Sequence, residues 1–426
     1  MAAAAAYTGA LGTLARALLA LDPYIPDKLA TRGEVATPLS SWTRLREGNF
    51  LLGRGANPYA AGSFHGPPLL LALVGPLTGE TPGARWASYA AWIAADLGTA
   101  WALARIAERR QRGPLSAVEG EVKWSGVRVA AIYLFHPFSI ATVVARSSTT
   151  FANLFLALAI EAAVSGSAIQ TAFFLSLATH LSLYPLLLLA PLIVLVSRHT
   201  HGPDVKTDRR ALARTALTSV AAFLLHQAVL LGASRWWTGG WEFLSSAYGV
   251  ILTIPDLTPN IGLAWYFFIE MFDHFRAFFL VIFALHPLVY VAPLTIAYRR
   301  DALFAVIVLV GTIALLKSYP SFGDWAFWHA LLGCYSELLP HVASPLFHSL
   351  LPLYALLLLP SFSHLWLVSN SGNANFFYAS TLVWAVGMGG WVVEVAKARG
   401  KREVLGALDG EGRKKVRSGE WVVVQR

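Results

Sequence analysis

The stretch Ala247–Phe275 reads AYGVILTIPDLTPNIGLAWYFFIEMFDHF, and it stands out from the long apolar runs around it. A polar turn bracketed by prolines, 255–260, leads into an aromatic segment that carries Glu270, Asp273 and His274. Polar backbone and ionisable groups at membrane depth are tolerated only where protein or a water-filled cavity covers them. The stretch therefore predicts the centre of a functional surface.

The surrounding chain has the composition of a membrane protein. Of its 426 residues, 56% are hydrophobic and 13% are charged, whereas a soluble protein would be roughly a quarter charged. Apolar runs of about 17–25 residues recur along the chain and predict an all-α polytopic membrane protein. The net charge of +9 lies mostly at the ends of these runs. It therefore indicates membrane orientation rather than a nucleic-acid partner.

The single cysteine and the N-terminal segment further restrict the class of protein and its possible sites. Cys334 lies inside an apolar run, which excludes an intrachain disulfide and a zinc cluster of cysteines. We expect no metal and no cofactor. The first residues lack a basic segment and Arg16 interrupts their apolar run, so 5–22 is predicted to be a retained first helix rather than a cleaved signal peptide.

The apolar runs predict about 12 transmembrane helices. The run at 67–77 is too short to cross about 30 Å at 1.5 Å per residue, so we expect it to be re-entrant. The run at 168–197 is long enough for two short helices hinged at Tyr184-Pro185. An amphipathic helix is expected near 40–52. The predicted spans are 5–22, 86–104, 127–145, 149–164, 168–197 as two helices, 212–234, 277–298, 302–317, 326–340, 345–361 and 376–396.

Charge predicts the orientation of these spans. Four segments carry 21 of the 33 Lys and Arg residues, and the positive-inside rule assigns them to the cytosol. Both termini are then cytosolic, and the long first loop and the opening stretch face the lumen. The segments expected in the cytosol are 105–125, 198–214, 299–301 and 397–426. We accordingly predict one integral membrane domain, 1–396, with lumenal loops 23–66, 235–260 and 317–325, followed by a basic cytosolic tail, 397–426.

The lumenal carboxylates offer little for catalysis. Only Glu270 and Asp273 are close in sequence, and their spacing predicts one helix face shared with His274. The set lacks a metal-binding signature, and the chain offers no credible nucleophile, so we expect no catalytic residues. The candidate carboxylates are Asp27, Glu34, Glu47, Glu242, Asp256, Glu270, Asp273 and Asp324.

Three polar corners are better suited to recognition. Asn260 is expected to cap the following helix through N–H groups near Leu263. Lys317 reads equally well as an interfacial lysine and as a partner for phosphate. The segment NSGNANFFY, 370–378, provides asparagines that could cap the last helix or bond sugar hydroxyls.

Several motifs together resemble the PIG-U family, a membrane subunit of the GPI transamidase. They recur in family order from the first loop to the last span, so the resemblance covers nearly the whole chain. Beside the opening stretch, they are VATPLSSWTRLREG (35–48), NPYAAGSFHGPPLL (57–70), LATHLSLYPL (177–186), LLKSYPSFGD (315–324) and SGNANFFYASTL (371–382).

The resemblance implies an endoplasmic reticulum protein that works beside PIG-K, GPAA1, PIG-T and PIG-S type subunits. In this family picture the complex joins the new C-terminus of a precursor protein to GPI, and another subunit carries the catalytic cysteine. The resemblance also implies a GT-C-like architecture and a role in recognising or presenting the GPI lipid. The residues we expect to contact GPI are Asp256, Thr258, Asn260, Trp265, Phe268, Glu270, Asp273, Lys317, Tyr319, Asp324, Asn373, Asn375 and Phe377.

Two other functions stay open at this point. One is a GT-C mannosyltransferase that acts on a lipid-linked glycan, with Glu34 as its base. In the comparable part of the first loop, TRGEVATPLSSW (31–42), Glu34 is the only acidic residue, and the lack of a paired aspartate there weakens this alternative. The other is a scaffolding subunit without a ligand of its own.

Overall fold

Helices make up most of the described part of the chain, and no strand occurs in it. The structure, a computed structural model, describes residues 2–60, 63–112, 123–201 and 209–408, together with 411–412, 415–416 and 420–421. The elements are α1 (Ala2–Leu21), α2 (Ile25–Ala30), α3 (Trp42–Gly53), α4 (Pro68–Val74), η1 (Gly75–Thr78), α5 (Pro82–Gln111), α6 (Gly126–Leu134), α7 (Pro137–Val144), α8 (Thr149–Val164), α9 (Ala168–Leu181), η3 (Tyr184–Leu188), α10 (Leu189–His201), α11 (Arg209–Thr238), η4 (Leu244–Gly249), α12 (Val250–Thr253), α13 (Ala264–Glu270), α14 (Asp273–Val289), α15 (Val291–Ala297), α16 (Ala302–Leu316), α17 (Phe322–Gly333), η5 (Ser336–His341), α18 (Pro345–Leu367) and α19 (Ala374–Ala407).

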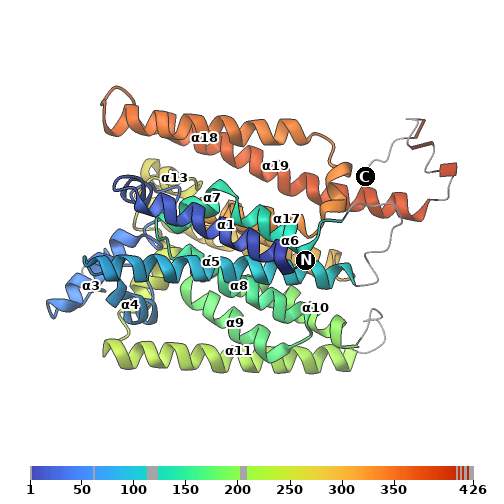
Figure 1. Cartoon of the computed structure of the whole chain (residues 1–426), viewed down its shortest axis with the longest axis horizontal. Helices are drawn as coiled ribbons and strands as arrows, with labels where there is room; N and C mark the ends of the chain where they lie inside the picture. The colour runs from blue at the N-terminus through green and yellow to red at the C-terminus, as the bar shows by residue number, and fades with distance from the viewer. Residues whose placement is uncertain are drawn as a thin grey trace.

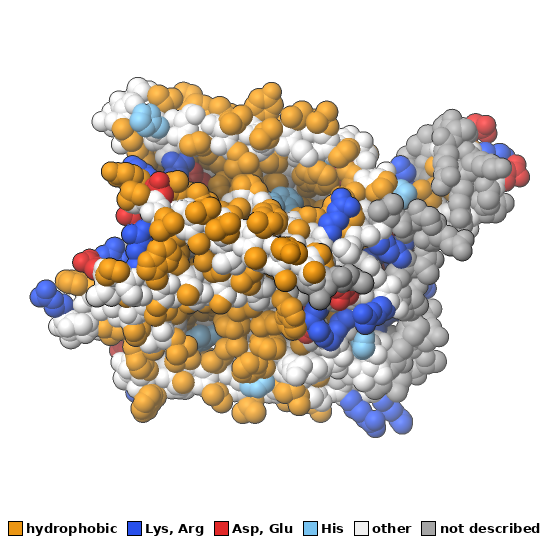
Figure 2. Space-filling view, viewed as in Figure 1, with side chains coloured by type: hydrophobic (Ala, Val, Ile, Leu, Met, Phe, Trp, Pro, Cys, Tyr) orange, Lys and Arg blue, Asp and Glu red, His pale blue; other side chains and the backbone are white. Residues whose placement is uncertain are grey.

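The long helices run side by side and have the length and composition of membrane spans (Figure 1). In the described part of the chain, five helices are long and apolar enough to cross a membrane. The number rises to six spans if α6 and α7 form one bent span. Hydrophobic side chains cover the middle of the face seen in Figure 2, and charged side chains gather toward its two ends. These features confirm an all-α membrane protein, while the total of about 12 crossings remains a prediction.

One predicted span, 127–145, is wrong as a continuous helix. It consists of α6 and α7, which are bent by 55° at Phe135 and His136. Pro137 cannot donate a backbone hydrogen bond and disfavours helix at the residue before it. The His136 ring accepts a bond from the Phe138 N–H at 3.2 Å and so caps the new helix.

Proline also shapes other spans. The hinge expected at Tyr184-Pro185 is confirmed, because α9 ends at Leu181 and the 3-10 helix η3 connects it to α10. The predicted span 277–298 divides into α14 and α15, and 326–340 divides into α17 and η5, which contains Pro340. The short run at 67–77 forms α4 and η1, and its depth in the membrane remains a prediction.

The last helix continues past the domain boundary placed at 396–397. The helix α19 runs to Ala407, and buried polar contacts hold this extension. The Arg399 guanidinium lies 3.3 Å from the Asp301 carboxylate. The same carboxylate accepts a 2.5 Å hydrogen bond from the Tyr335 hydroxyl. Most of 408–426 lies outside the described residues.

The two ends of the bundle differ in content. The start of α1 and the end of α19 lie at one end, whereas α3, α4, α13 and the turn between α18 and α19 lie at the other (Figure 1). We refer to the second end as the α3 end. The buried helices α16 and α17 form the centre of the core. The first loop, the opening stretch and the residues that follow α16 therefore meet at the α3 end.

Candidate functional site

The turn at 255–260 is held by its own side chains and backbone. Ile254 ends α12 in a left-handed conformation, φ 45°. The Asn260 side chain makes two bonds here. Its Oδ1 accepts from the Gly262 N–H at 2.7 Å, and its Nδ2 donates to the Thr258 backbone carbonyl at 3.0 Å. The N-cap of α13 is Leu263, so the prediction that Asn260 caps this helix is wrong. The Asn260 side chain instead closes the turn that precedes the helix.

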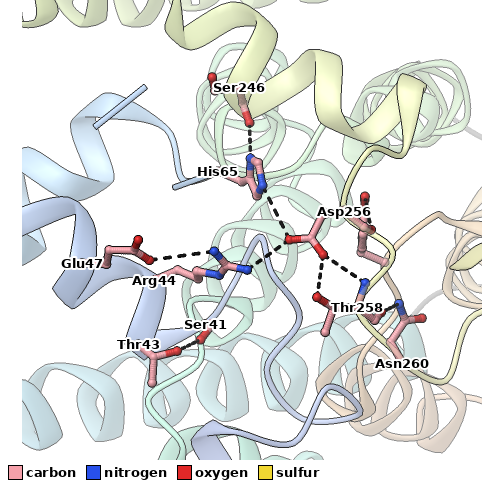
Figure 3. Close-up of polar contacts among 10 residues, drawn as sticks. Ser41, Thr43, Arg44, Glu47, His65, Ser246, Asp256, Thr258 and Asn260 are labelled. Carbon is pink, nitrogen blue, oxygen red and sulfur yellow. Dashed lines mark hydrogen bonds and ion pairs between the residues drawn. The ribbon is translucent and has the colours of Figure 1, made fainter. Parts of the chain in front are cut away.

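Asp256 projects from this turn into a cluster of groups from the first loop (Figure 3). Its Oδ2 lies 3.2 Å from an Arg44 guanidinium nitrogen and 3.8 Å from Nε2 of His65. Its Oδ1 accepts bonds from the Thr258 backbone N–H at 3.0 Å and hydroxyl at 2.5 Å. The carboxylate therefore joins two loops that are far apart in the sequence.

His65 is the buried member of the Asp256 cluster. Its Nδ1 lies 2.9 Å from the Ser246 carbonyl oxygen, which makes Nδ1 the protonated nitrogen of the neutral ring. Burial lowers the pKa of His65, and the Ser246 carbonyl and the Asp256 carboxylate oppose this shift only in part. A neutral imidazole is thus part of the folded site.

We expect His65 to make the protein less stable in mild acid. Because its folded pKa lies below the ordinary value of about 6.5, the unfolded chain binds the proton more readily, and the free energy of unfolding falls as pH drops below about 6.5. A His65→Asn variant keeps a donor for Ser246 but does not titrate. Thermal unfolding at about pH 7 and about pH 5 should show a smaller loss for this variant than for the natural chain. Equal losses would show that His65 titrates without a shift.

Tyr319 connects the Asp256 cluster to the corner after α16. Its hydroxyl donates to the Asp256 backbone carbonyl at 2.9 Å, and burial raises the pKa of this phenol. Two residues earlier, the Lys317 ammonium lies 2.7 Å from the Asp324 carboxylate. Asp324 also accepts from the Ser321 N–H at 2.8 Å and completes a capping box at the start of α17. The two predicted corners thus form one connected structure.

A cavity of about 90 Å³ lies beside Lys317. It is polar near Lys317, where hydroxyl and amide groups line it, and apolar toward the middle of α8 and α16. A pocket that combines an apolar wall with a few polar groups is typical of ligand sites. Its lining consists of Thr37, Leu39, Ser40, Ser148, Thr149, Ala152, Asn153, Leu156, Leu181, Ser182, Tyr184, Pro185, Leu188, Val310, Ile313, Ala314, Lys317, Tyr319, Asp324 and Phe327.

The first loop is fixed against both corners. A Cβ atom added at Gly33 would lie 2.0 Å from the Pro259 carbonyl oxygen, so the two backbones are in close contact. The next residue, Glu34, accepts a 2.7 Å bond from the Phe322 N–H through its backbone carbonyl. Its buried carboxylate is paired with Arg32 at 2.7 Å. Glu34 therefore serves the structure of this loop.

The predicted aromatic residues belong to the core. Trp265, Phe268 and Phe377 are at most 3% exposed, and the rings of Trp265 and Phe377 pack edge to face at 5.9 Å. The Trp265 indole N–H also donates to the Asn260 carbonyl at 3.0 Å. The Trp265 and Phe377 rings fasten the turn to α19, whereas Phe268 packs against Phe283 of α14. None of the three lines the cavity.

The helix face predicted for Glu270 and Asp273 is wrong. The helix α13 ends at Glu270, Met271 and Phe272 are extended, and Asp273 begins α14. The Arg276 guanidinium donates to the Phe268 carbonyl of α13 at 3.3 Å. It also donates to the Ile254 carbonyl, at the end of α12, at 2.8 Å. Both carboxylates are exposed. Among the described residues there is no group of three or more His, Cys, Asp or Glu arranged for a metal ion.

The last predicted corner stands apart from the cavity. Asn373 and Asn375 are exposed at the start of α19, and the Asn373 side chain accepts from the Asn375 N–H at 3.1 Å. The expected capping of the last helix is thus confirmed for Asn373. Neither residue lines the cavity beside Lys317.

Sequence reasoning missed several residues of the site. Arg44 and His65 bind Asp256 from the first loop, and Ser148, Asn153 and Leu156 line the cavity from the start of α8. Arg44 and His65 lie within the motifs at 35–48 and 57–70, so the resemblance marked their segments. Spacing could not reveal their partner, because 212 residues separate Arg44 from Asp256.

Comparison with known proteins places this chain in a family. The sequence model described as GPI transamidase subunit PIG-U matches residues 10–384. The human protein named GPI-anchor transamidase component PIGU is 33% identical over 380 residues, which cover 84% of this chain and 85% of the relative. The GPI transamidase component GAB1 of Saccharomyces cerevisiae is 31% identical over 389 residues, which cover 91% and 92%. The GAB1 homolog of Schizosaccharomyces pombe is 31% identical over 377 residues, which cover 88% and 89%. The chain is a member of the PIG-U family.

Proposed function

We propose that this protein is a non-catalytic subunit of the GPI transamidase that holds the GPI lipid for attachment to the C-terminus of precursor proteins. The relatives named as transamidase components support the assignment to this complex. The observation that carries the lipid-binding role is the cavity beside Lys317, which joins a charged corner to an apolar wall. An amphipathic ligand such as GPI needs both.

The two parts of the cavity suit the two parts of the lipid. The Lys317 side chain is 13% exposed and lies 2.7 Å from Asp324, so an incoming phosphate would exchange one anionic partner for another. Asn153 and the neighbouring hydroxyls provide partners for a glycan. Leu156, Ile313 and Phe327 provide apolar surface for an acyl chain.

The other predicted site residues take supporting or external roles in this proposal. Asp256, Thr258, Asn260 and Tyr319 hold the wall of the cavity, and the buried rings of Trp265, Phe268 and Phe377 hold the turn. The exposed groups at the α3 end are proposed to contact PIG-K, GPAA1, PIG-T and PIG-S type subunits. These exposed groups are Glu270, Asp273, Asn373 and Asn375.

The same proposal includes a topology in the endoplasmic reticulum membrane. We assign about 12 crossings in a GT-C-like arrangement to α1, α5, α6 with α7, α8, α9, η3 with α10, α11, α14 with α15, α16, α17, α18 and α19. The start of α1 and the end of α19 lie at the same end, which supports an even number of crossings (Figure 1). By the positive-inside rule this end is cytosolic and the α3 end is lumenal.

A Leu156→Trp variant is expected to lose GPI while the complex stays assembled. The indole would fill the apolar part of the cavity, and loss of several apolar contacts corresponds to at least a tenfold drop in bound lipid, or about 1.4 kcal/mol. The measurement is lipid mass spectrometry of the purified complex, with the subunits quantified in the same sample. The matched control is Leu225→Trp on α11, where the leucine is 63% exposed.

The outcomes separate lipid recognition from scaffolding. Lipid loss with normal subunit proportions supports the proposal. Normal lipid content in Leu156→Trp would rule out this cavity as the GPI site. Loss of subunits together with lipid would favour the scaffolding function instead.

A further inference from the structure

A second feature at the α3 end has no role in the cavity beside Lys317. Arg146 directly follows α7 and its C-cap Ala145, and it adopts a left-handed backbone with φ 52°. Glycine is usual at such a position after a helix, because a residue with a Cβ atom is strained there. Strain of this kind clusters at ligand-binding and catalytic sites. The question is what the Arg146 side chain does.

The Arg146 guanidinium is buried between two aromatic rings. Its central carbon lies 4.1 Å from the ring centroid of Trp42 and 4.8 Å from that of Tyr89. The residue is 9% exposed. Its Nη1 reaches the Ser88 hydroxyl at 3.4 Å, while its buried Nε has no hydrogen-bond partner within the described part of the chain.

This buried cation also lacks an anionic partner in the described residues, since none of their carboxylates pairs with it within 4.0 Å. Desolvation accordingly lowers the pKa of Arg146, and the nearby Asp27 offsets this only in part. A buried guanidinium normally has a carboxylate or phosphate partner, because a charge removed from water without compensation is strongly disfavoured. The side chain is therefore prepared for an anion.

A polar pocket of about 150 Å³ opens beside Arg146. Two further arginines line it. Arg85 is half-buried and donates to the Ala20 carbonyl at 2.9 Å, at the end of α1. Arg46 forms an exposed ion pair with Glu80 at 2.9 Å. The full lining is Pro23, Pro26, Asp27, Trp42, Arg46, Thr78, Gly79, Glu80, Arg85 and Arg146.

The charge in this pocket is positive. Three arginines face two carboxylates, Asp27 and Glu80, and both carboxylates are exposed to solvent. Glu80 is already paired with Arg46, which leaves Arg85 and Arg146 without an ion pair among the described residues. The pocket shares no lining residue with the cavity beside Lys317.

We propose that this pocket is a separate binding site for a phosphate group. Planar guanidinium groups bind phosphate oxygens through paired N–H donors, which makes a cluster of arginines more suitable for phosphate than for a monovalent halide. The pocket lies where α1 ends and α5 begins, which is the lumenal side of the bundle in the proposed topology. The phosphate can therefore come from a phospholipid headgroup or from a free phosphate, and both present the same oxygens to Arg146 and Arg85.

The test measures binding to purified full-length protein in detergent. Three ligands are added separately: a short-chain phosphatidylinositol, a diacylglycerol with the same chains, and inorganic phosphate. Native mass spectrometry detects the bound lipids, and calorimetry detects the bound phosphate. The variants are Arg146→Gln and Arg85→Gln. The control is Arg54→Gln, an exposed arginine at the end of α3 that also stacks on a ring, that of Phe50 at 5.1 Å.

Phosphatidylinositol or phosphate is expected to bind about tenfold more weakly to Arg146→Gln, and more weakly to Arg85→Gln, than to Arg54→Gln and the natural chain. Binding of the lipid alone identifies a headgroup, and binding of both ligands identifies the phosphate itself. Equal binding to all variants, or equal binding of the diacylglycerol, overturns the proposal. If Arg146→Gln does not fold, the test uses Arg146→Lys and Arg85→Gln instead. Unchanged binding of the ligands to Arg85→Gln then overturns the proposal.

Discussion

A Gly33→Ala variant is expected to lose at least about 3 kcal/mol of stability, at the upper end of what overpacking costs. The added Cβ would lie 2.0 Å from the Pro259 carbonyl oxygen, and a backbone atom cannot turn away as a side chain can. The contact joins the first loop to the turn at 255–260, so the strain falls on the wall of the site. Thermal unfolding of the detergent-solubilised protein measures the loss.

Gly53→Ala is the matched control for this prediction. No atom lies within 4 Å of a Cβ at Gly53, which ends α3. Alanine is favoured over glycine in a helix by up to about 1 kcal/mol, so this variant should be as stable as the natural chain or slightly more stable. Equal melting temperatures for the two alanine variants would show that the first loop is not seated against the turn.

Replacing Asp96 by leucine is expected to cost about 3–5 kcal/mol, because it leaves a buried cation without its partner. Arg16 and Asp96 are each 1% exposed, and their charged atoms lie 2.5 Å apart. Arg16 also donates to the Leu134 carbonyl at 2.8 Å, a group that the break between α6 and α7 leaves free. The pair therefore fastens α1 to α5 and to the bent span.

The double variant Arg16→Leu with Asp96→Leu should recover most of the stability that Asp96→Leu loses. Removal of both charges leaves no uncompensated ion, and buried pairs replaced by apolar residues are often neutral. The control Glu80→Leu breaks an exposed pair and should cost under about 1 kcal/mol. If the double variant were no more stable than Asp96→Leu, the loss would come from packing and not from the unpaired charge.

Local sequence signals predicted the elements whose causes are local. The span 149–164 agrees with α8, and the hinge at Tyr184-Pro185 follows from the proline. The break before Pro137 carried the same signal, but the apolar run on both sides concealed it. The break after Glu270 contains neither proline nor glycine. At this break the Arg276 guanidinium donates to the carbonyls of Phe268 and Ile254, contacts that no local pattern predicts.

The site was predictable in part for the same reason. The prolines and Asn260 marked the turn, and Lys317 with Asp324 marked the second corner. Their connection runs through the Tyr319 hydroxyl and the Asp256 carbonyl, a tertiary contact that no sequence period reveals. The buried state of Trp265 was equally hidden, because an aromatic residue beside a polar turn suits both a ligand wall and a core.

The most direct measurement is a density map of the assembled transamidase with bound GPI. The proposal predicts that the lipid phosphate lies within hydrogen-bond distance of Lys317 and that an acyl chain runs along Leu156 and Phe327. A lipid bound elsewhere in the complex, with the cavity beside Lys317 occupied by this chain's own side chains, would contradict the proposed function.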